Sequence, residues 1–290
     1  MKIFEIAYRY ERDVADARPR PANAEAARSR LDEGSRAIAA MLADAAHGTG
    51  IARHVIPVDP RNLGLDAHAQ GAPVQRPFAA VLGCADARVP VELVFNEGPN
   101  DLFVVRVAGN GLGAEVLGSL RYAADHLGDS LQLVVVLGHS GCGAVSAAVD
   151  VFLNPQAYLG LATQHALRGI LDSLLVVVHS VAKRLAAVAG PDVTRRPGYR
   201  AALIEAAIVS NAALAAYTVQ QSLARAGRTT LRAAYGVYVL ESREIWAPRG
   251  GSAECAGLAW PPEGDAGFLA FADAVLQSDR IVVMLERGEA

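Results

Sequence analysis

The sequence predicts an α/β fold in which a central, mainly parallel β-sheet is flanked by helices. Short apolar runs at residues 79–82 and 133–137 are each ended by glycine, a pattern typical of fully buried parallel strands. Segments with strand character alternate along the chain with segments of helical apolar spacing, which favours a parallel sheet. The polar residues that follow the two runs therefore lie at the carboxyl ends of strands, where open α/β sheets place their ligand sites.

The composition limits the class of protein. The chain has 290 residues, of which 52% are hydrophobic and 20% charged, enough for one large core with appendages. The net charge of −3 gives no indication of a nucleic-acid partner. We find no basic-then-apolar leader and no apolar run near the roughly 18 residues of a membrane span, so we expect no membrane association. We expect an N-terminal arm over residues 1–22 and a single α/β domain over residues 23–290.

The N-terminal quarter of the chain is predicted to hold one helix. Charges and prolines in residues 1–21 favour an irregular arm. Asn23 is a typical N-cap for a helix predicted over residues 24–46. Residues 48–77 are rich in Gly, Pro, Asp and Asn and are predicted to form a loop. Two isolated histidines of this loop are expected to be solvated rather than metal ligands: His54 and His68.

The rest of the chain gives the alternating pattern. Strands are predicted at residues 79–82, 102–106, 133–137, 231–240, 243–246 and 281–285. Helices are predicted at residues 90–97, 113–126, 141–149, 170–189, 200–226 and 267–277. Residues 154–169 have no clear pattern, and residues 248–264 are predicted to be a loop because of their prolines and glycines. Residues 174–178 would also suit a strand.

The two strand ends carry residues that suit a metal. If the chain from Cys84 onward is extended, the side chains of Cys84, Asp86 and Arg88 point the same way, because strand side chains alternate. Two residues separate His139 from Cys142, a spacing that lets both side chains reach one ion from a tight turn. Two thiolates and an imidazole suit Zn²⁺, and three protein ligands leave a fourth position open. The alternative is that the cysteines pack as small hydrophobic residues, beside a core histidine and a surface ion pair.

Together the two motifs resemble those of the β-class carbonic anhydrases. The likeness rests on Cys84-x-Asp86-x-Arg88 and His139-x-x-Cys142, and it extends to the stretches 101–110 and 138–145. It is dense from about residue 75 to residue 149 and thinner through residues 234–238. The resemblance implies the same fold class, one zinc per chain in the domain over residues 23–290, and a homodimer or a multiple of it. In that family an N-terminal helical arm packs on a neighbouring subunit.

The resemblance also implies an activity, the reversible hydration of carbon dioxide to bicarbonate and a proton. Cys84, His139 and Cys142 would hold the zinc, which lowers the pKa of bound water from about 15.7 to about 7. Asp86 would accept a hydrogen bond from the zinc-bound water or hydroxide. Arg88 would pair bidentately with Asp86 and keep it ionised and oriented. Cys142 lies at the expected start of a helix, where the dipole favours a thiolate.

Further residues match the substrate pocket of the family. By motif, Gln75, Phe103 and Tyr122 correspond to residues that line the substrate cleft, part of which comes from the other subunit. The N–H of Gly143 can point toward the product, because glycine lets the chain approach closely. One position departs from the family: Ala87 stands where a serine commonly follows the aspartate, so we expect a lower efficiency.

Two other functions stay open at this point. One is the hydrolysis of a CO₂-like substrate, carbonyl sulfide or carbon disulfide, on the same scaffold. The other is a non-catalytic zinc protein, in which Asp86 serves as fourth ligand and closes the site. A pairing of Asp86 with Arg88 favours the open, catalytic form, and an Asp86–zinc bond favours a closed or resting form.

The cysteines also bear on the compartment. Three cysteines in 290 residues imply no disulfide framework, and thiolate ligands fit a reducing compartment, so we expect a cytoplasmic protein.

Cys255 is predicted to be dispensable for metal binding and activity. It lies in a Gly/Pro-rich segment with no second cysteine or histidine nearby, and two cysteines and one histidine already fill a catalytic zinc site. We expect Cys255→Ser to keep both its zinc, measured by metal analysis, and its rate of CO₂ hydration. A clear loss of zinc would point to a second site or a different ligand set.

Overall fold

A five-stranded sheet with the strand order β4-β3-β5-β6-β7 forms the centre of the protein. The computed structural model describes residues 3–11, 18–47, 50–65, 71–156, 158, 160, 165–248 and 257–287. The strands are β3 (Ala79–Gly83), β4 (Leu102–Arg106), β5 (Leu133–His139), β6 (Arg232–Tyr238) and β7 (Ile245–Trp246). Neighbouring strands from β4 to β6 run parallel, and the short β7 pairs antiparallel with β6. This arrangement confirms the predicted, mainly parallel sheet.

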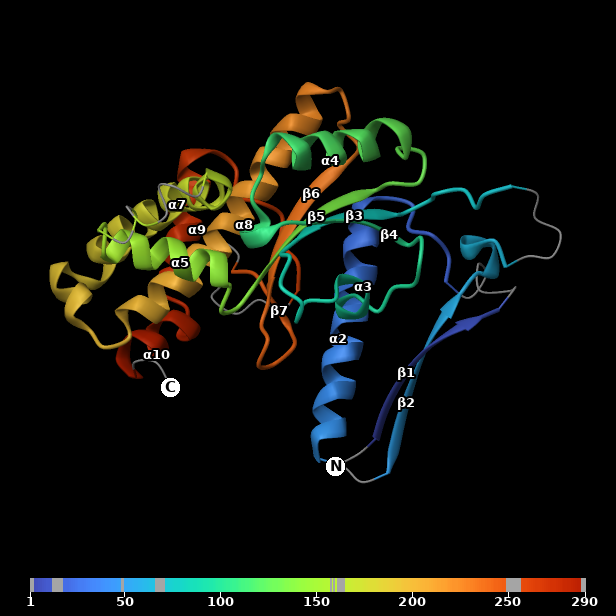
Figure 1. Ribbon diagram of the computed structural model, residues 1–290, viewed down its shortest axis with the longest axis horizontal. Helices are drawn as coiled ribbons and strands as arrows, with labels where there is room; N and C mark the ends of the chain where they lie inside the picture. Colours follow the sequence, from blue (N-terminus) through green and yellow to red (C-terminus); the bar gives the residue numbers. More distant parts are fainter. Residues whose placement is uncertain are drawn as a thin grey trace.

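Helices cover both faces of the sheet, as Figure 1 shows. Every residue of β3 and β5 is buried. On one face Leu82 and Val136 belong to an apolar cluster with the long helix α8 (Tyr199–Arg225). On the other face Val81 belongs to a cluster with Leu31 of α2 (Ala24–His47). A strand that is buried on both faces needs apolar side chains at every position, which explains the continuous runs in the sequence.

The other helices confirm most of the predicted pattern. They are α3 (Val91–Val94), α4 (Ala114–His126), α5 (Gly143–Leu153), α7 (His165–Ala189), α9 (Gly264–Leu276) and α10 (Asp279–Arg287). The 3₁₀ segments are η1 (Pro60–Leu63), η2 (Ala108–Asn110) and η3 (Pro191–Arg195). Helix α2 begins after Asn23, whose side-chain oxygen accepts a hydrogen bond from the Ala26 N–H at 2.9 Å. This bond confirms the predicted N-cap.

Helix α8 lies against the sheet and is long and apolar. By length and composition alone, it is the one helix of the described residues that could cross a membrane. However, 72% of its most apolar window is buried inside the fold. That burial is the position of a core helix, and α8 packs directly on β5 and β6.

The N-terminal region differs from the prediction. Residues 3–10, expected to be an irregular arm, form strand β1 (Ile3–Tyr10), and β2 (Ile51–Val58) lies in the region expected to be a loop. The two strands pair in parallel as a separate sheet, because both segments are rich in isoleucine, valine and tyrosine. His54, expected to be solvated, is half-buried and its Nε2 lies 2.7 Å from Asn96 Oδ1. His68 lies outside the described residues.

The C-terminal strand prediction is wrong, because residues 279–287 form helix α10. Ile281 and Leu285 are buried, whereas Val282 and Val283 between them are 38% and 39% exposed. Burial at positions i and i+4 is the period of a helix, not of a strand. The apolar run was too short to distinguish a strand from a helix, and it lacked an adjoining glycine.

A buried ion-pair network holds α2 against the segment after α3. The Glu97 side chain is fully buried and accepts hydrogen bonds from Arg30 Nε at 2.8 Å and from Arg18 Nη2 at 3.0 Å. Burial raises the pKa of Glu97 to about 7, although Arg30 opposes that shift. Gly34 of α2 lies so close to the Phe95 carbonyl that a Cβ there would be 2.1 Å from its oxygen. These contacts fix α2 to the domain.

We expect Arg30→Met to destabilise the protein more at pH 8 than at pH 5. The folded-state pKa of Glu97, about 7, is above its ordinary value of 4.5, so its protonation favours the folded state and its ionisation costs stability as the pH rises through 7. Removing one partner of a buried ion pair costs about 3–5 kcal/mol when the remaining group is charged. Urea unfolding at both pH values tests this, with Arg36→Met on the exposed side of α2 as the control. Equal losses at the two pH values would contradict the role given to Glu97.

Candidate metal centre

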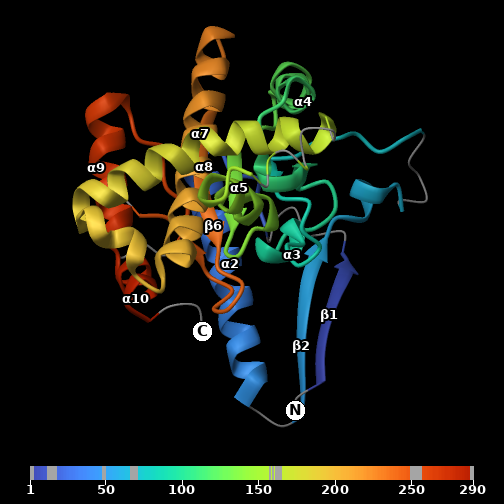
Figure 2. The same ribbon diagram turned by 60° about the vertical axis from the view of Figure 1, so that its left-hand side comes forward.

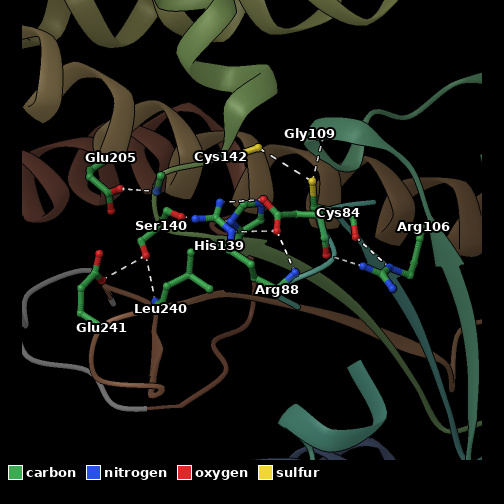
Figure 3. Close-up of polar contacts among 12 residues, drawn as sticks. Cys84, Arg88, Arg106, Gly109, His139, Ser140, Cys142, Glu205, Leu240 and Glu241 are labelled. Carbon is green, nitrogen blue, oxygen red and sulfur yellow. Dashed lines mark hydrogen bonds and ion pairs between the residues drawn. The ribbon is translucent and has the colours of Figure 1, made fainter. Parts of the chain in front are cut away.

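Three ligand-type side chains meet at the carboxyl edge of the sheet (Figure 3). Cys84 follows β3, His139 ends β5, and Cys142 is the N-cap residue of α5. Because β3 and β5 are parallel neighbours in the sheet, their carboxyl ends lie side by side. The two sulfurs are 3.9 Å apart, and the ligand atoms of all three residues lie within 4.8 Å of one another. All three residues are buried.

The geometry of this group fits a zinc ion. The Nδ1 of His139 lies 3.0 Å from the Ser140 carbonyl oxygen and donates to it, which leaves the lone pair of Nε2 free to bind a metal. Among the described side chains, His139 Nε2 is one of two buried nitrogen or oxygen atoms without a hydrogen-bond partner. A tetrahedral zinc with bonds to sulfur of about 2.3 Å separates the two sulfurs by about 3.8 Å. The observed sulfur–sulfur distance is 3.9 Å, so the residues present suit the ion.

The thiols influence each other's protonation. The hydrogen bond from Cys142 lowers the pKa of Cys84, and the same bond, together with burial, raises the pKa of Cys142. Burial lowers the pKa of His139, but the neighbouring Cys84 sulfur outweighs burial and raises the pKa overall. A cation between the sulfurs would relieve the repulsion that two thiolates would otherwise feel.

The loop at η2 is shaped around the Cys84 sulfur. The N–H of Gly109 donates to Cys84 Sγ at 3.4 Å. Gly109 has a φ of +64°, and a Cβ there would lie 3.1 Å from Leu174 Cδ1 and 3.2 Å from Ala144 Cβ. Glycine is therefore required here, because any other side chain would be both strained and crowded.

Asp86 and Arg88 form a clamp beside the ligands. The Asp86 oxygens accept from the Arg88 backbone N–H at 2.9 Å, from its Nε at 3.0 Å and from its Nη2 at 2.7 Å. The guanidinium of Arg88 holds the pKa of Asp86 well below its usual range. Asp86 Oδ2 lies 3.8 Å from His139 Nε2. Asp86 is thus next to the ligand group but paired with Arg88, the arrangement expected of an open site.

The strand alternation predicted for Cys84, Asp86 and Arg88 would require an extended chain after β3, but the chain there is not extended. The strand β3 ends at Gly83, and the chain then turns, with the Val89 N–H bonded to the Asp86 carbonyl at 3.1 Å. Strand alternation therefore does not orient Asp86. Its direction is set by Arg88 and by Arg106, whose guanidinium donates to the backbone carbonyls of Cys84 and Asp86.

Helix α8 forms hydrogen bonds with two loops of the site, at Gly141 and at Gly109. The buried Glu205 accepts the N–H of Gly141 at 2.9 Å, in the turn between His139 and Cys142. Its other oxygen accepts from Nε and Nη2 of Arg280 in α10, at 3.1 and 2.9 Å. Six residues further along α8, the Nδ2 of Asn211 donates to the Gly109 carbonyl at 2.9 Å. One helix thus positions both the turn that carries two ligands and the loop that faces the third.

Sequence reasoning missed these supporting residues. Glu205 could have been singled out in the sequence, because it is the one acidic residue in the apolar stretch that forms α8. Buried carboxylates are rare without a partner. Nothing in the sequence singled out Asn211 or Arg280, because their hydrogen-bond partners lie far away along the chain. Ser140 was likewise missed: its hydroxyl donates to Glu241 at 3.2 Å and accepts the Leu240 N–H at 2.9 Å.

The predicted pocket residues are not part of the ligand group. Gln75 is exposed in a segment without regular structure, and Phe103 is half-buried on β4. Tyr122 on α4 is 52% exposed and stacks on His126 with ring centroids 4.7 Å apart. Gly143 opens α5, with open space around it. Their roles, and that of Cys255, which lies outside the described residues, stay predictions.

Comparison with known proteins gives one family. A family profile described as "Carbonic anhydrase" matches residues 79–242, more than half of the chain. Carbonic anhydrase 2 of Mycobacterium tuberculosis is 48% identical over 85 residues, which are 29% of this chain and 40% of that protein. A carbonic anhydrase of Pseudomonas aeruginosa is 43% identical over 79 residues, 25% of this chain and 35% of that protein. The matched part of the chain thus spans 40% or less of the length of these two relatives.

Solved structures give a more distant likeness. A β-carbonic anhydrase of Aspergillus fumigatus has a TM-score of 0.46 and 18% identity, over 70% of this chain and 82% of that one. The Coccomyxa β-carbonic anhydrase in complex with acetazolamide has a TM-score of 0.43 and 24% identity, over 60% of this chain and 72% of that one. The family assignment therefore rests on the profile match.

We expect Glu205→Ala to weaken zinc binding. The variant leaves the Gly141 N–H and the Arg280 guanidinium without their buried acceptor, so the turn between the two ligands is held less firmly. Loss of a group that orients ligands typically costs about 10–100-fold in metal affinity. Competition with a chromophoric chelator measures the zinc affinity, with exposed Glu33→Ala as the neutral control and Cys142→Ala as the variant that should lose the metal. An unchanged affinity at reduced thermal stability would restrict Glu205 to a purely structural role.

Proposed function

Because this chain belongs to the β-carbonic anhydrase family, we propose that it catalyses the zinc-dependent, reversible hydration of carbon dioxide to bicarbonate and a proton. The observation that carries the proposal is the buried Nε2 of His139, which lacks a hydrogen-bond partner and lies with the sulfurs of Cys84 and Cys142 within 4.8 Å. An imidazole nitrogen left in this state is unfavourable unless a cation binds it.

The three ligands determine what the site can do. Cys84 and Cys142 supply two negative charges, His139 supplies a neutral nitrogen, and a fourth position is left for water. Zinc bound there lowers the pKa of water from about 15.7 to about 7 and so supplies a nucleophile at neutral pH. Because Cys84 and Cys142 are buried, bulk water does not compete with the thiolates for the ion.

In this proposal Asp86 orients the reacting water. Both Asp86 oxygens accept hydrogen bonds from Arg88, so the group is an ionised carboxylate that can only accept. It accepts the O–H of the water and thereby turns an oxygen lone pair toward carbon dioxide. With zinc bound, these bonds from Arg88 would keep Asp86 from binding the ion itself and would leave a position for substrate.

The product side of the site uses the start of α5 and the predicted pocket. The N–H of Gly143 donates to bicarbonate, favoured by the positive end of the helix dipole. Gln75, Phe103 and Tyr122 line the approach of the substrate. The exposure of Gln75 and Tyr122 in the single chain supports a pocket completed by a second subunit, in a homodimer or a multiple of it. The thiolate ligands support a reducing, cytoplasmic compartment.

The direct test is stopped-flow CO₂ hydration with the zinc-loaded protein, its zinc content measured in parallel. Carbonyl sulfide and carbon disulfide are offered to the same preparation. The proposal expects CO₂ hydration to be the fastest of the three reactions. Faster hydrolysis of either sulfur compound would replace the proposal by that activity, and no turnover at full zinc content would leave a structural metal site.

Asp86→Asn should keep its zinc and its fold but lose activity. The amide presents an N–H where an acceptor is needed, and loss of one positioning partner costs about 10–100-fold. Arg88→Ala should do similar harm, because Asp86 is then free to swing toward the ion. The measurement is the CO₂ hydration rate at equal zinc content.

The chain offers a matched control for this pair. Asp59 and Arg61 form the same Asp-x-Arg clamp away from the ligands, with the Arg61 N–H 2.9 Å and its Nη2 2.6 Å from the Asp59 oxygens. Asp59→Asn therefore tests the clamp as a structural unit and should keep the wild-type rate. Equal rates for Asp86→Asn and Asp59→Asn would remove Asp86 from the mechanism.

A further inference from the structure

Strands β1 and β2 form a parallel ribbon that extends from the body of the protein beside α2 (Figures 1 and 2). A sheet of two strands is only marginally stable, and parallel strands are normally covered on both faces. Here several large apolar side chains of the ribbon are exposed, namely Ile3, Ile6, Tyr8, Tyr10 and Ile51. The ribbon therefore offers apolar surface and open backbone groups for another chain.

The alternation of hydrogen bonds along β1 shows which of its backbone N–H and C=O groups do not bond to β2. The N–H of Ile3 donates to Gly50 at 2.9 Å, and the N–H of Glu11 donates to Val58 at 3.0 Å. In a parallel pair the residues between them alternate, so the odd-numbered residues of β1 bond to β2. The even-numbered residues direct their N–H and C=O groups to the outer edge of β1. These residues are Phe4, Ile6, Tyr8 and Tyr10.

The two edges of the ribbon differ. On β2 the outward-facing residues are the odd-numbered ones, and they include Pro57, which lies opposite Arg9 in the register. Proline has no N–H and protects an edge from pairing. The outer edge of β1 contains neither proline nor glycine, so it is the edge that can accept another strand.

We propose that β1 pairs antiparallel with the β1 strand of a second copy of this chain, about a twofold axis at Ala7. In this register Phe4 lies opposite the partner's Tyr10, and Ile6 opposite the partner's Tyr8. All four positions are even-numbered, so their N–H and C=O groups do not bond to β2. Each pair can therefore exchange two backbone hydrogen bonds across the new strand pair. The register also places Glu5 opposite the partner's Arg9, and does so twice because of the symmetry.

The faces of the combined sheet agree with this register. Tyr8 and Tyr10 lie opposite Ile56 and Val58 of β2, which are only 1% and 2% exposed, so the even-numbered side chains of β1 lie on the face toward the body of the protein. The apolar pairs then lie on the face directed toward the body, and the Glu5–Arg9 pairs lie on the opposite face. Opposite charges directly across two strands stabilise their pairing. The existing ion pair between Glu5 and Arg53, 3.0 Å, lies on the same face as the Glu5–Arg9 pairs and is kept.

Disulfide trapping tests the register without reference to activity. Ala7→Cys, made in the Cys255→Ser background, brings two sulfurs together at the axis, where the Cα–Cα distance of a pair without hydrogen bonds is about 4.5 Å, within the range for a disulfide. We expect a covalent dimer on mild oxidation. Arg53→Cys on the same face is the control, because three strand spacings separate the two copies by about 14 Å. Equal cross-linking of the two variants, or none in Ala7→Cys, would overturn the proposal.

Charge reversal gives an independent measurement. Adding Arg9→Glu to Ala7→Cys places like charges opposite each other twice and should lower the yield of cross-linked dimer roughly tenfold. Adding Glu5→Arg as well restores opposite charges and should recover most of the yield. Light scattering on Arg9→Glu in the natural background should give half the mass of the wild-type assembly. An unchanged mass together with an unchanged cross-linking yield would contradict the proposed interface.

Discussion

The structure depends on the convergence of two cysteine sulfurs and one imidazole nitrogen within 4.8 Å of one another, in a buried position. Such a group is unfavourable by itself: two thiolates repel each other, and His139 Nε2 has no hydrogen-bond partner. A bound cation attracts both thiolates and accepts the lone pair of His139 Nε2, so both effects then favour the folded site. The fold around the site therefore has to hold three ligands at a spacing that is stable with the ion in place.

The α/β architecture supplies this spacing from separate parts of the chain. Parallel pairing of β3 with β5 brings Cys84 to the end of the strand that carries His139. Helix α8 then fixes the intervening loops, Glu205 through the turn at Gly141 and Asn211 through the loop at Gly109. The Arg280–Glu205 pair connects α10 to the same turn, so the C-terminal helix contributes to a site whose ligands all precede residue 143.

The sheet and the meeting of Cys84, His139 and Cys142 at its edge could be predicted from local sequence patterns. Apolar runs ended by glycine mark β3 and β5, and the ligands directly follow those runs. The supporting contacts could not be predicted, since Glu205 and Gly141 are 64 residues apart and only the folded helix brings them together. Local patterns also misled at three places. The charges in residues 1–21 and the prolines at the end of that stretch obscured β1, and the glycines and prolines of residues 48–77 obscured β2. The run at residues 281–285 was too short to separate strand from helix. Asp86 lies 3.8 Å from His139 Nε2, but a turn rather than strand alternation orients it.

The central claim is that Cys84, His139 and Cys142 bind one zinc and leave one position open. X-ray absorption spectroscopy at the zinc edge, on protein whose zinc content is known, tests it most directly. The account predicts one zinc per chain with two sulfurs at about 2.3 Å, one imidazole nitrogen at about 2.0–2.1 Å and one further light atom. A first shell without sulfur, or with three or four sulfurs, would contradict it.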